Sequence, residues 1–309
     1  MKYSKYTYEQ FLNELKLRLE KHFGDDYDVV LDKIFKNNGS IVWSFIIYEK
    51  GPVKYPKASP VINVEDIYNA YLSGESINSI IEKIDYIYGV FSENKIDICN
   101  VNADNAQQCI FYRLVNYEKN KELLEELPHI RFLDLALTFH YLYNADTDMM
   151  QSLRITNKIM EQWQLEIEQL IEIAEKNTPE LFPDKIDTIK NVIESLMDKK
   201  LEDVLSEDEL AERREMYVLT NEKSINGATA IFYSDKIKEL AELYQQDIVI
   251  LPSSIHEVLL LPIESEEETG MLQSLVESIN KEHVAKEEVL SDTVYIYDRQ
   301  KGEIDILQT

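Results

Sequence analysis

Glycine is scarce in this sequence. Only 8 glycines occur among 309 residues, whereas about 7% is the usual share. The glycines are not clustered, and neither G-x-G-x-x-G nor G-x-x-x-x-G-K-[ST] is present. These two motifs hold phosphates on a glycine-rich loop. Nucleotide binding by either mode is therefore disfavoured, other modes stay open, and we expect no cofactor.

Cysteines and long hydrophobic runs are also few. Cys99 and Cys109 are the only cysteines, and two thiols form neither a disulfide framework nor a four-cysteine zinc site. The apolar runs IVWSFIIY and VLLLPI have the length of strands, not of membrane spans. The first ten residues, MKYSKYTYEQ, contain no apolar signal region. We therefore expect a reduced, cytoplasmic protein that does not bind membranes.

Basic residues are few relative to acidic ones. The sequence has 32 basic and 58 acidic residues, which gives a net charge of −26. Such a surface repels nucleic-acid phosphates and anionic lipids. Direct binding to nucleic acid is therefore not expected, whereas a basic protein partner would suit the charge. The simpler interpretation is that the charge only keeps the protein soluble. The 19 tyrosines favour partner contacts wherever they lie on an exposed face.

Residues 1–95 have the pattern of a small α+β domain. Thr7 and Gln10 fit a T-x-x-Q capping box before an amphipathic helix. Two strand-like runs flank residues 37–39, Asn-Asn-Gly, which predicts a hairpin. Two helices are expected over VEDIYNAYL and INSIIEKIDYIYGVF, the second capped by Ser76.

Residues 104–309 have the pattern of a larger α+β domain. Asp104 is expected to cap a helix through AQQCIFYRLVNYEKN, and HIRFLDLALTFHYLYNA is expected to be one strand with SLRIT as its partner. Apolar residues at helical spacing predict a long helix from Ile159, ended by Asn177 and Pro179.

The rest of this domain begins with an acidic segment at 184–215 that we expect to be helical. MYVLT, ATAIFY, DIVILPSS and EVLLLPI are strand-like, KIKELAELYQQ and MLQSLVESINKEH are helical, and TVYIYDRQKGEIDIL is a hairpin. The fold class predicted is α+β: a helix–hairpin–helices unit is followed by a larger mixed domain with a mainly antiparallel sheet.

The segment LPSSIHEVLLLP, residues 251–262, carries the chemistry that invites a catalytic interpretation. Ser253 or Ser254 could be a nucleophile with His256 as its base and Glu257 as the orienting acid. On a strand, however, Glu257 points away from the other two side chains, and no G-x-S-x-G motif occurs. The structural interpretation is a turn between two buried strands, in which His256 hydrogen-bonds the backbone. We favour that interpretation.

Metal binding is not supported by the histidine spacing. His256-Glu257 begins like a zincin helix, but Leu260 stands where the second histidine is needed. His140, within FHYLY, is interpreted as a hydrogen-bonded structural residue, and Trp43 and Trp163 as core residues. We therefore predict no metal site.

Polar residues elsewhere are candidates for binding. Asn221 and Asn226 are possible polar neighbours of the 251–262 segment, and Glu266, Glu267 and Glu268 are expected to form an exposed acidic turn. These five residues are the binding candidates that the sequence offers.

Three stretches resemble an uncharacterised domain family of gut Clostridia and related Firmicutes, often carried on mobile elements. They are WQLEIEQLIEIAEKNT, GATAIFYSDKIKELAELYQQDIVILPSSIHEVLLLP and EEVLSDTVYIYDRQKGEI. More distantly, the same order is similar to a second uncharacterised bacillar family. That second family tends to have arginine–aspartate after its proline–serine turn, where this chain has residues 255–257, Ile-His-Glu. Neither resemblance implies a known activity, so no catalytic residue follows from it.

Three functional hypotheses remain. The first is a non-catalytic protein-binding or accessory protein of a mobile element that engages a basic partner, as a nucleic-acid mimic or an inhibitor of host machinery. The second is a hydrolase centred on Ser253, Ser254, His256 and Glu257. The third is a small-molecule sensor in which the C-terminal sheet forms the ligand pocket. We favour the first; the oligomeric state does not follow from the sequence.

Overall fold

The computed structural model consists of two compact units, residues 1–102 and residues 103–309. We call them the N-terminal and the C-terminal unit and describe each by itself. The residues described are 5–50, 61–93, 107–146, 149–197, 200, 215–252, 254–263 and 271–308.

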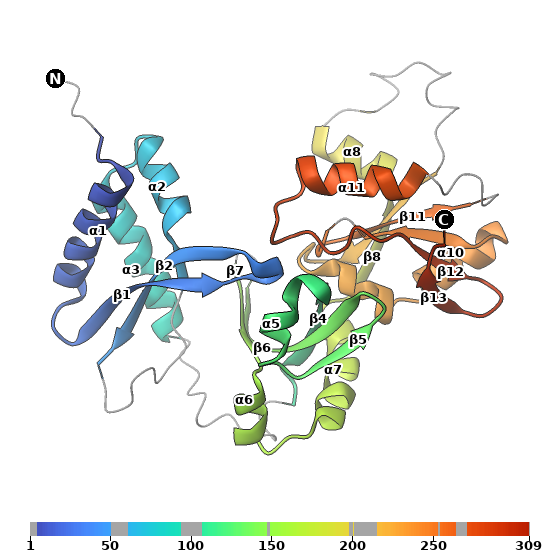
Figure 1. Ribbon diagram of the computed structural model, residues 1–309, viewed down its shortest axis with the longest axis horizontal. Helices are drawn as coiled ribbons and strands as arrows, with labels where there is room; N and C mark the ends of the chain where they lie inside the picture. The colour runs from blue at the N-terminus through green and yellow to red at the C-terminus, as the bar shows by residue number, and fades with distance from the viewer. Residues whose placement is uncertain are drawn as a thin grey trace. The chain divides into compact units, whose positions relative to one another are not determined.

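The N-terminal unit packs three helices on one side of a three-stranded antiparallel sheet (Figure 1). The helices are α1 (Tyr8–Phe23), α2 (Val64–Leu72) and α3 (Ile77–Glu93), and the strands are β1 (Tyr27–Phe35), β2 (Ile41–Glu49) and β3 (Val61–Asn63). Fully or almost fully buried side chains from α1, β2 and α3 meet in one core: Phe11, Leu15, Leu19, Phe45, Ile47, Ile80 and Ile84.

The local signals in this unit are confirmed. Thr7 and Gln10 form the reciprocal capping box of α1, and the Ser76 hydroxyl accepts a hydrogen bond from the Ser79 N–H in the first turn of α3. Asn38 and Gly39 both adopt positive φ, of 58° and 61°, which the tight β1–β2 connection requires. The short strand β3 was not anticipated.

Trp43 is not a core residue, contrary to expectation. Its side chain is 43% exposed and lies under the ammonium group of Lys33, 5.2 Å from the ring centroid. Trp43 pairs with Lys33 across the hairpin, beyond the part of β1 and β2 that contributes buried side chains. Trp43 lies on the same face of β2 as the buried residues Phe45 and Ile47, but at this end of the hairpin no described helix covers that face.

The C-terminal unit contains two antiparallel sheets. The six-stranded sheet has the order β13-β12-β10-β11-β9-β8, and every neighbouring pair in it is antiparallel. Its strands are β8 (Asp184–Thr188), β9 (Tyr217–Asn221), β10 (Ile248–Leu251), β11 (Val258–Pro262), β12 (Tyr295–Asp298) and β13 (Glu303–Ile306).

Helices cover this sheet, and its central strand is fully buried. All four residues of β10 are buried. Val249 and Leu251 pack with Val276 of α11, whereas α10 also contacts β10 and β11. The helices are α8 (Ile189–Met197), α10 (Lys236–Tyr244) and α11 (Leu272–His283).

The second sheet is built around one long strand. Strand β6 pairs with β4 along one edge and with β5 and β7 along the other. The elements here are β4 (Ile110–Asn116), α5 (Lys121–Leu124), β5 (His129–Phe132), β6 (Leu135–Asp146), β7 (Met149–Arg154), α6 (Asn157–Gln162), α7 (Ile167–Leu181) and the 3₁₀ helix η4 (Gly227–Phe232). The predicted α+β class with mainly antiparallel sheets is thus confirmed.

Several predicted elements of this unit are wrong. The expected helix after Asp104 is strand β4, whose residues are buried on both faces, so that no strand alternation is visible. The single strand expected from His129 is two strands, which turn at Leu133 with φ of 55°. The expected strand ATAIFY is the buried 3₁₀ helix η4.

The long helix and the acidic segment also differ from expectation. Positive φ at Gln164 separates α6 from α7, and α7 continues through Asn177 and Pro179 to Leu181. The segment expected to be helical begins with strand β8 before α8. Its continuation, residues 201–214, lies outside the described residues.

Candidate functional site

The free edge of β4 is closed by side chains instead of by another strand. The N–H groups of Tyr112 and Leu114 donate to the hydroxyl oxygens of Thr178 on α7 and Thr229 on η4, both at 3.3 Å. The side-chain amide of Asn177 donates to the Ile110 carbonyl at 3.0 Å. These bonds satisfy buried backbone groups that an edge strand would leave unpaired, and they fix α7 and η4 against β4.

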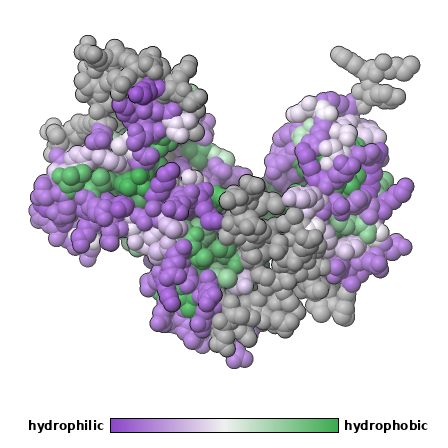
Figure 2. Space-filling view, turned by 180° about the vertical axis from the view of Figure 1, so that it is seen from behind, coloured by the Kyte–Doolittle hydropathy of each residue, from purple (hydrophilic) through white to green (hydrophobic). Residues whose placement is uncertain are grey.

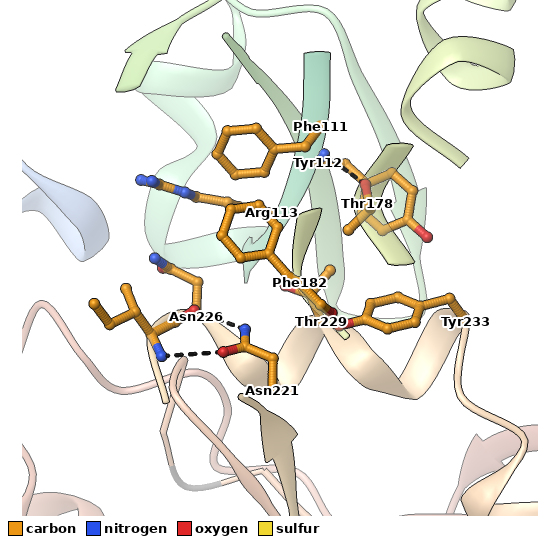
Figure 3. A pocket seen from close by; sticks show the side chains of 10 residues that line it. Phe111, Tyr112, Arg113, Thr178, Phe182, Asn221, Asn226, Thr229 and Tyr233 are labelled. Carbon is orange, nitrogen blue, oxygen red and sulfur yellow. Dashed lines mark hydrogen bonds between the residues drawn. The ribbon is translucent and has the colours of Figure 1, made fainter. Parts of the chain in front are cut away.

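A small pocket lies where these elements meet β9 (Figure 3). Its cavity volume is about 10 Å³, and it is lined by Phe111, Tyr112, Arg113, Thr178, Phe182, Asn221, Ile225, Asn226, Thr229 and Tyr233. Its walls combine aromatic rings with one guanidinium, two amides and hydroxyl groups. A concave site with few convergent polar groups is the usual form of a ligand pocket.

Asn221 shapes the loop that forms the lower wall of this pocket in Figure 3. Its side-chain oxygen accepts from the Lys223 N–H at 3.0 Å, and its amide donates to the Ile225 carbonyl at 2.9 Å. Asn226 then takes a left-handed conformation, with φ of 53°, which asparagine tolerates better than most residues. The two asparagines named as binding candidates therefore lie together at the pocket.

Basic groups gather on the face of the second sheet that this pocket adjoins. Phe111, His140 and Arg154 are cross-strand neighbours on β4, β6 and β7, and Arg113 lies two residues after Phe111 on the same face. One guanidinium nitrogen of Arg113 donates to the Ser152 hydroxyl at 2.8 Å, while its Nε is buried without a hydrogen-bond partner.

The ionisation of these groups follows from their burial. Burial, and next the charge of Arg154, lowers the pKa of Arg113 to about 10. Burial, followed by the charges of Arg113 and Arg154, lowers the pKa of His140 well below the ordinary imidazole value, so its ring is neutral at pH 7. The His140 ring nitrogen Nε2 lies 3.1 Å from the Thr138 hydroxyl, as a structural, hydrogen-bonded histidine should.

Ser254 and His256, the described serine and histidine of the 251–262 segment, each bond a backbone N–H group and not each other's side chain. The Ser254 hydroxyl oxygen accepts from the backbone N–H of His256 at 2.9 Å, and the serine is only 7% exposed. The imidazole Nδ1 accepts from the Asn226 backbone N–H at 3.3 Å, and Nε2 lies 3.6 Å from a carboxylate oxygen of Glu288. The side chains of both residues therefore stabilise the conformation of the connection between β10 and β11.

Gly227 locks this segment against β9. A Cβ atom at Gly227 would lie 2.5 Å from the His256 carbonyl oxygen and 2.7 Å from the Asn221 nitrogen, and it would also collide with the Thr220 hydroxyl. The Thr220 hydroxyl itself donates to the His256 carbonyl at 2.7 Å. Close packing of three backbones therefore explains why glycine stands here.

Five candidates from the sequence remain to be placed. Glu257 is partly exposed beside the turn. Ser253, Glu266, Glu267 and Glu268 lie outside the described residues.

Neither a cluster of possible metal ligands nor a membrane-spanning helix occurs in the part of the chain that the structure describes. Its histidine, cysteine, aspartate and glutamate side chains form no group of three or more that could hold an ion. None of its helices combines the length and apolarity that crossing a bilayer requires.

Comparison with known proteins places the sequence in a family. Residues 8–299 match the model of DUF5688, a family of unknown function. The chain belongs to this family. No curated protein and no solved structure matches the sequence. All pocket residues and the 251–262 segment lie within the matched range, so both are part of the DUF5688 domain itself. The expected membership of a family without known activity is confirmed, and the association with mobile elements stays a prediction.

Three basic residues of this DUF5688 chain were not recognised as a group from the sequence. Arg113 and Arg154 each stand in an apolar strand, in IFYRLVN and SLRIT, and His140 was recognised only as structural. An arginine flanked by apolar residues on both sides was the available signal, because arginine is seldom buried without a partner. The register that brings the three together depends on long-range strand pairing, which the sequence does not show.

Proposed function

We propose that this DUF5688 chain is a non-catalytic binding protein that engages a basic protein partner. The observation that carries the proposal is the hydrogen bonding of Ser254 and His256. The Ser254 hydroxyl oxygen and the His256 ring each accept a bond from a backbone N–H group, which supports a structural role for both side chains. The hydrolase alternative requires the Ser254 hydroxyl to face the imidazole instead of the His256 N–H.

The charge distribution supports a basic partner. The C-terminal unit, residues 103–309, has 43 acidic against 20 basic residues, so it carries almost all of the net charge. Exposed Glu168, Glu172 and Glu175 follow one another on α7 at spacings of four and three, which places them on one helical face. Outside the grey atoms, hydrophilic residues cover most of the face seen in Figure 2. Such a field steers and selects cationic partners.

The resemblance to a family often carried on mobile elements suggests which partners to examine. We extend the proposal to an accessory role in a mobile element, with host machinery that normally binds nucleic acid as the partner. The acidic C-terminal unit would then compete with phosphates for the same basic surface.

Affinity capture at rising salt tests this function. The chain should retain a basic protein at low ionic strength and release it at high ionic strength, because charge attraction is screened. A triple variant, Glu168→Gln, Glu172→Gln and Glu175→Gln, should lose the partner. The matched control changes Glu9, Glu65 and Glu82, which are exposed on the N-terminal unit, to glutamine. Equal retention by all three proteins would contradict a role for α7.

A serine-directed covalent probe tests the hydrolase alternative separately. We expect no labelling of the wild-type chain. Labelling that disappears in Ser254→Ala, with the fold intact, would restore the hydrolase hypothesis.

A small-molecule sensor is the second candidate function. It is favoured by the pocket, to which strand β9 of the six-stranded sheet contributes Asn221. A screen for compounds that raise the melting temperature tests it, since a ligand that binds only the folded state stabilises that state.

A further inference from the structure

The pocket adjoins a cluster of basic residues on the second sheet. We define this cluster as Arg113, His140 and Arg154. Among the described residues, neither arginine forms an ion pair with a carboxylate, and the two guanidinium groups repel each other. The only side-chain hydrogen-bond partner of Arg113 there is the neutral Ser152 hydroxyl.

Burying two like-charged guanidinium groups without a carboxylate lowers the stability of the folded state unless another group offsets the cost. Removing a guanidinium from water is costly, and proteins normally offset that cost with a carboxylate and full hydrogen bonding. Here the cost is increased by a second cation, and the Nε of Arg113 makes no bond. Buried polar groups left unsatisfied in a folded protein usually serve a ligand or a mechanism.

The pocket supplies a place for the compensating group. Arg113 lines it together with Asn226, and in Figure 3 their polar ends lie on the same side. The rings of Phe111 and Phe182, with centroids 4.9 Å apart, form an apolar wall. The cavity volume of about 10 Å³ leaves room only for the oxygen atoms of one small group that enters from the open side. The low polarity around Arg113 would strengthen its attraction for an anion.

We infer that this pocket binds a compact oxyanion, the phosphate or carboxylate group of a small molecule, with Arg113 as its principal ligand and the Asn226 amide as a second donor. The planar guanidinium fork matches either group in a bidentate manner. Arg154 contributes long-range attraction from the neighbouring strand. The inference rests on the sensor function, of which it names the ligand class, and it is independent of the basic protein partner.

Thermal unfolding in the presence of simple anions tests the inference. Inorganic phosphate and acetate represent the two oxyanion classes, and sodium chloride at equal ionic strength is the control. At about ten times the dissociation constant, the binding anion should raise the melting temperature by about 3 to 6 °C. This rise is counted above the melting temperature in sodium chloride of equal ionic strength, which screens charge repulsion without filling the site. The anion that raises the melting temperature identifies the ligand group as a phosphate or a carboxylate.

Substitution of Arg113 connects the shift to the site. Arg113→Met should abolish the anion shift. Because it removes a desolvated, repelled charge, it should also melt at or above the wild-type temperature in buffer of low ionic strength. The control is Arg131→Met, on β5, since the Arg131 side chain is 55% exposed and pairs with Glu118. That variant should keep the anion shift.

A second variant covers the case in which Arg113→Met does not fold. Asn226→Asp changes one atom, keeps a residue type that tolerates positive φ, and places a carboxylate beside Arg113. It should remove the shift by competing with the added anion.

Several results would overturn the inference. They are an equal shift with chloride, no shift with any oxyanion, or a wild-type shift retained in folded Arg113→Met or Asn226→Asp. If oxyanions fail while neutral compounds still raise the melting temperature, the ligand class is wrong but the sensor function stands.

Discussion

At the residue scale, Gly227 is a position where packing, not backbone freedom, demands glycine. An added methyl group would collide with Thr220 and with the backbones of His256 and Asn221. We expect Gly227→Ala to destabilise the C-terminal unit by about 1–3 kcal/mol, the usual cost of overpacking, as measured by urea unfolding.

The control for this change is Gly89→Ala. A Cβ atom at Gly89 in α3 meets nothing within 4 Å, and alanine favours helices. This variant should be neutral or stabilising. A Gly227→Ala protein as stable as the wild type would show that the three backbones separate easily.

His140 is a residue whose protonation opposes folding. Its pKa is depressed in the folded state by burial and by the two nearby arginines, so the unfolded chain binds the proton more tightly. The stability due to neutral His140 is therefore fully present above the unfolded pKa of about 6.5 and is lost as the pH falls below it. The loss should be about 1.4 kcal/mol per pH unit.

Comparison of variants isolates this contribution from that of the carboxylates. Between pH 6.5 and 5.5, His140→Gln should lose about 1 kcal/mol less stability than the wild type, measured by urea unfolding. The difference is below the limiting slope because the unfolded histidine is only half protonated at about pH 6.5. His283→Gln, at a histidine that is 73% exposed, should follow the wild type. Identical pH profiles of all three proteins would refute the assignment of His140 as a buried neutral base.

At the element scale, α7 acts as a substitute for a strand. The Thr178 hydroxyl accepts the Tyr112 N–H and donates to the Ala174 carbonyl. Thr178→Val keeps the shape but leaves the N–H unpaired, which should cost about 1–3 kcal/mol in urea unfolding. Thr178→Ser retains the hydroxyl and should cost clearly less. A loss from Thr178→Ser as large as that from Thr178→Val would mean that packing of the methyl group contributes as much as the hydroxyl hydrogen bonds.

The elements that local signals specify were predictable, and those that depend on distant partners were not. Capping at Thr7 and Ser76 and the hairpin turn at Asn38 need only neighbouring residues, so the sequence contains the information. Strand β4 was assigned as a helix because both of its faces are buried and its edge is closed by Thr178 and Thr229, far along the chain.

The same distinction applies to the candidate site. Asn221 and Asn226 were recognisable as polar residues near a loop, because turns favour asparagine. The grouping of Arg113 with Arg154 was not, since it arises from the pairing of both β4 and β7 with β6. The sequence shows that each arginine is present, but which charges surround it depends on the strand pairing of the folded sheet.

At the scale of the whole molecule, charge is divided unequally between the two units. The N-terminal unit has 15 acidic and 12 basic residues, against 43 and 20 in the C-terminal unit. Self-repulsion of like charges weakens a compact state and is screened by salt. We therefore expect sodium chloride, from about 10 to 150 mM, to raise the melting temperature of the C-terminal unit and to leave that of the N-terminal unit nearly unchanged.

The two tryptophans allow each unit to be followed in the intact chain. Trp43 lies in the N-terminal unit and buried Trp163 in the C-terminal unit. Fluorescence of Trp43→Phe then reports the C-terminal transition, and that of Trp163→Phe the N-terminal one. A C-terminal transition that salt does not raise would mean that its acidic residues lie too far apart to repel. A surface of that kind could not present the dense negative field on which recognition of a basic partner depends.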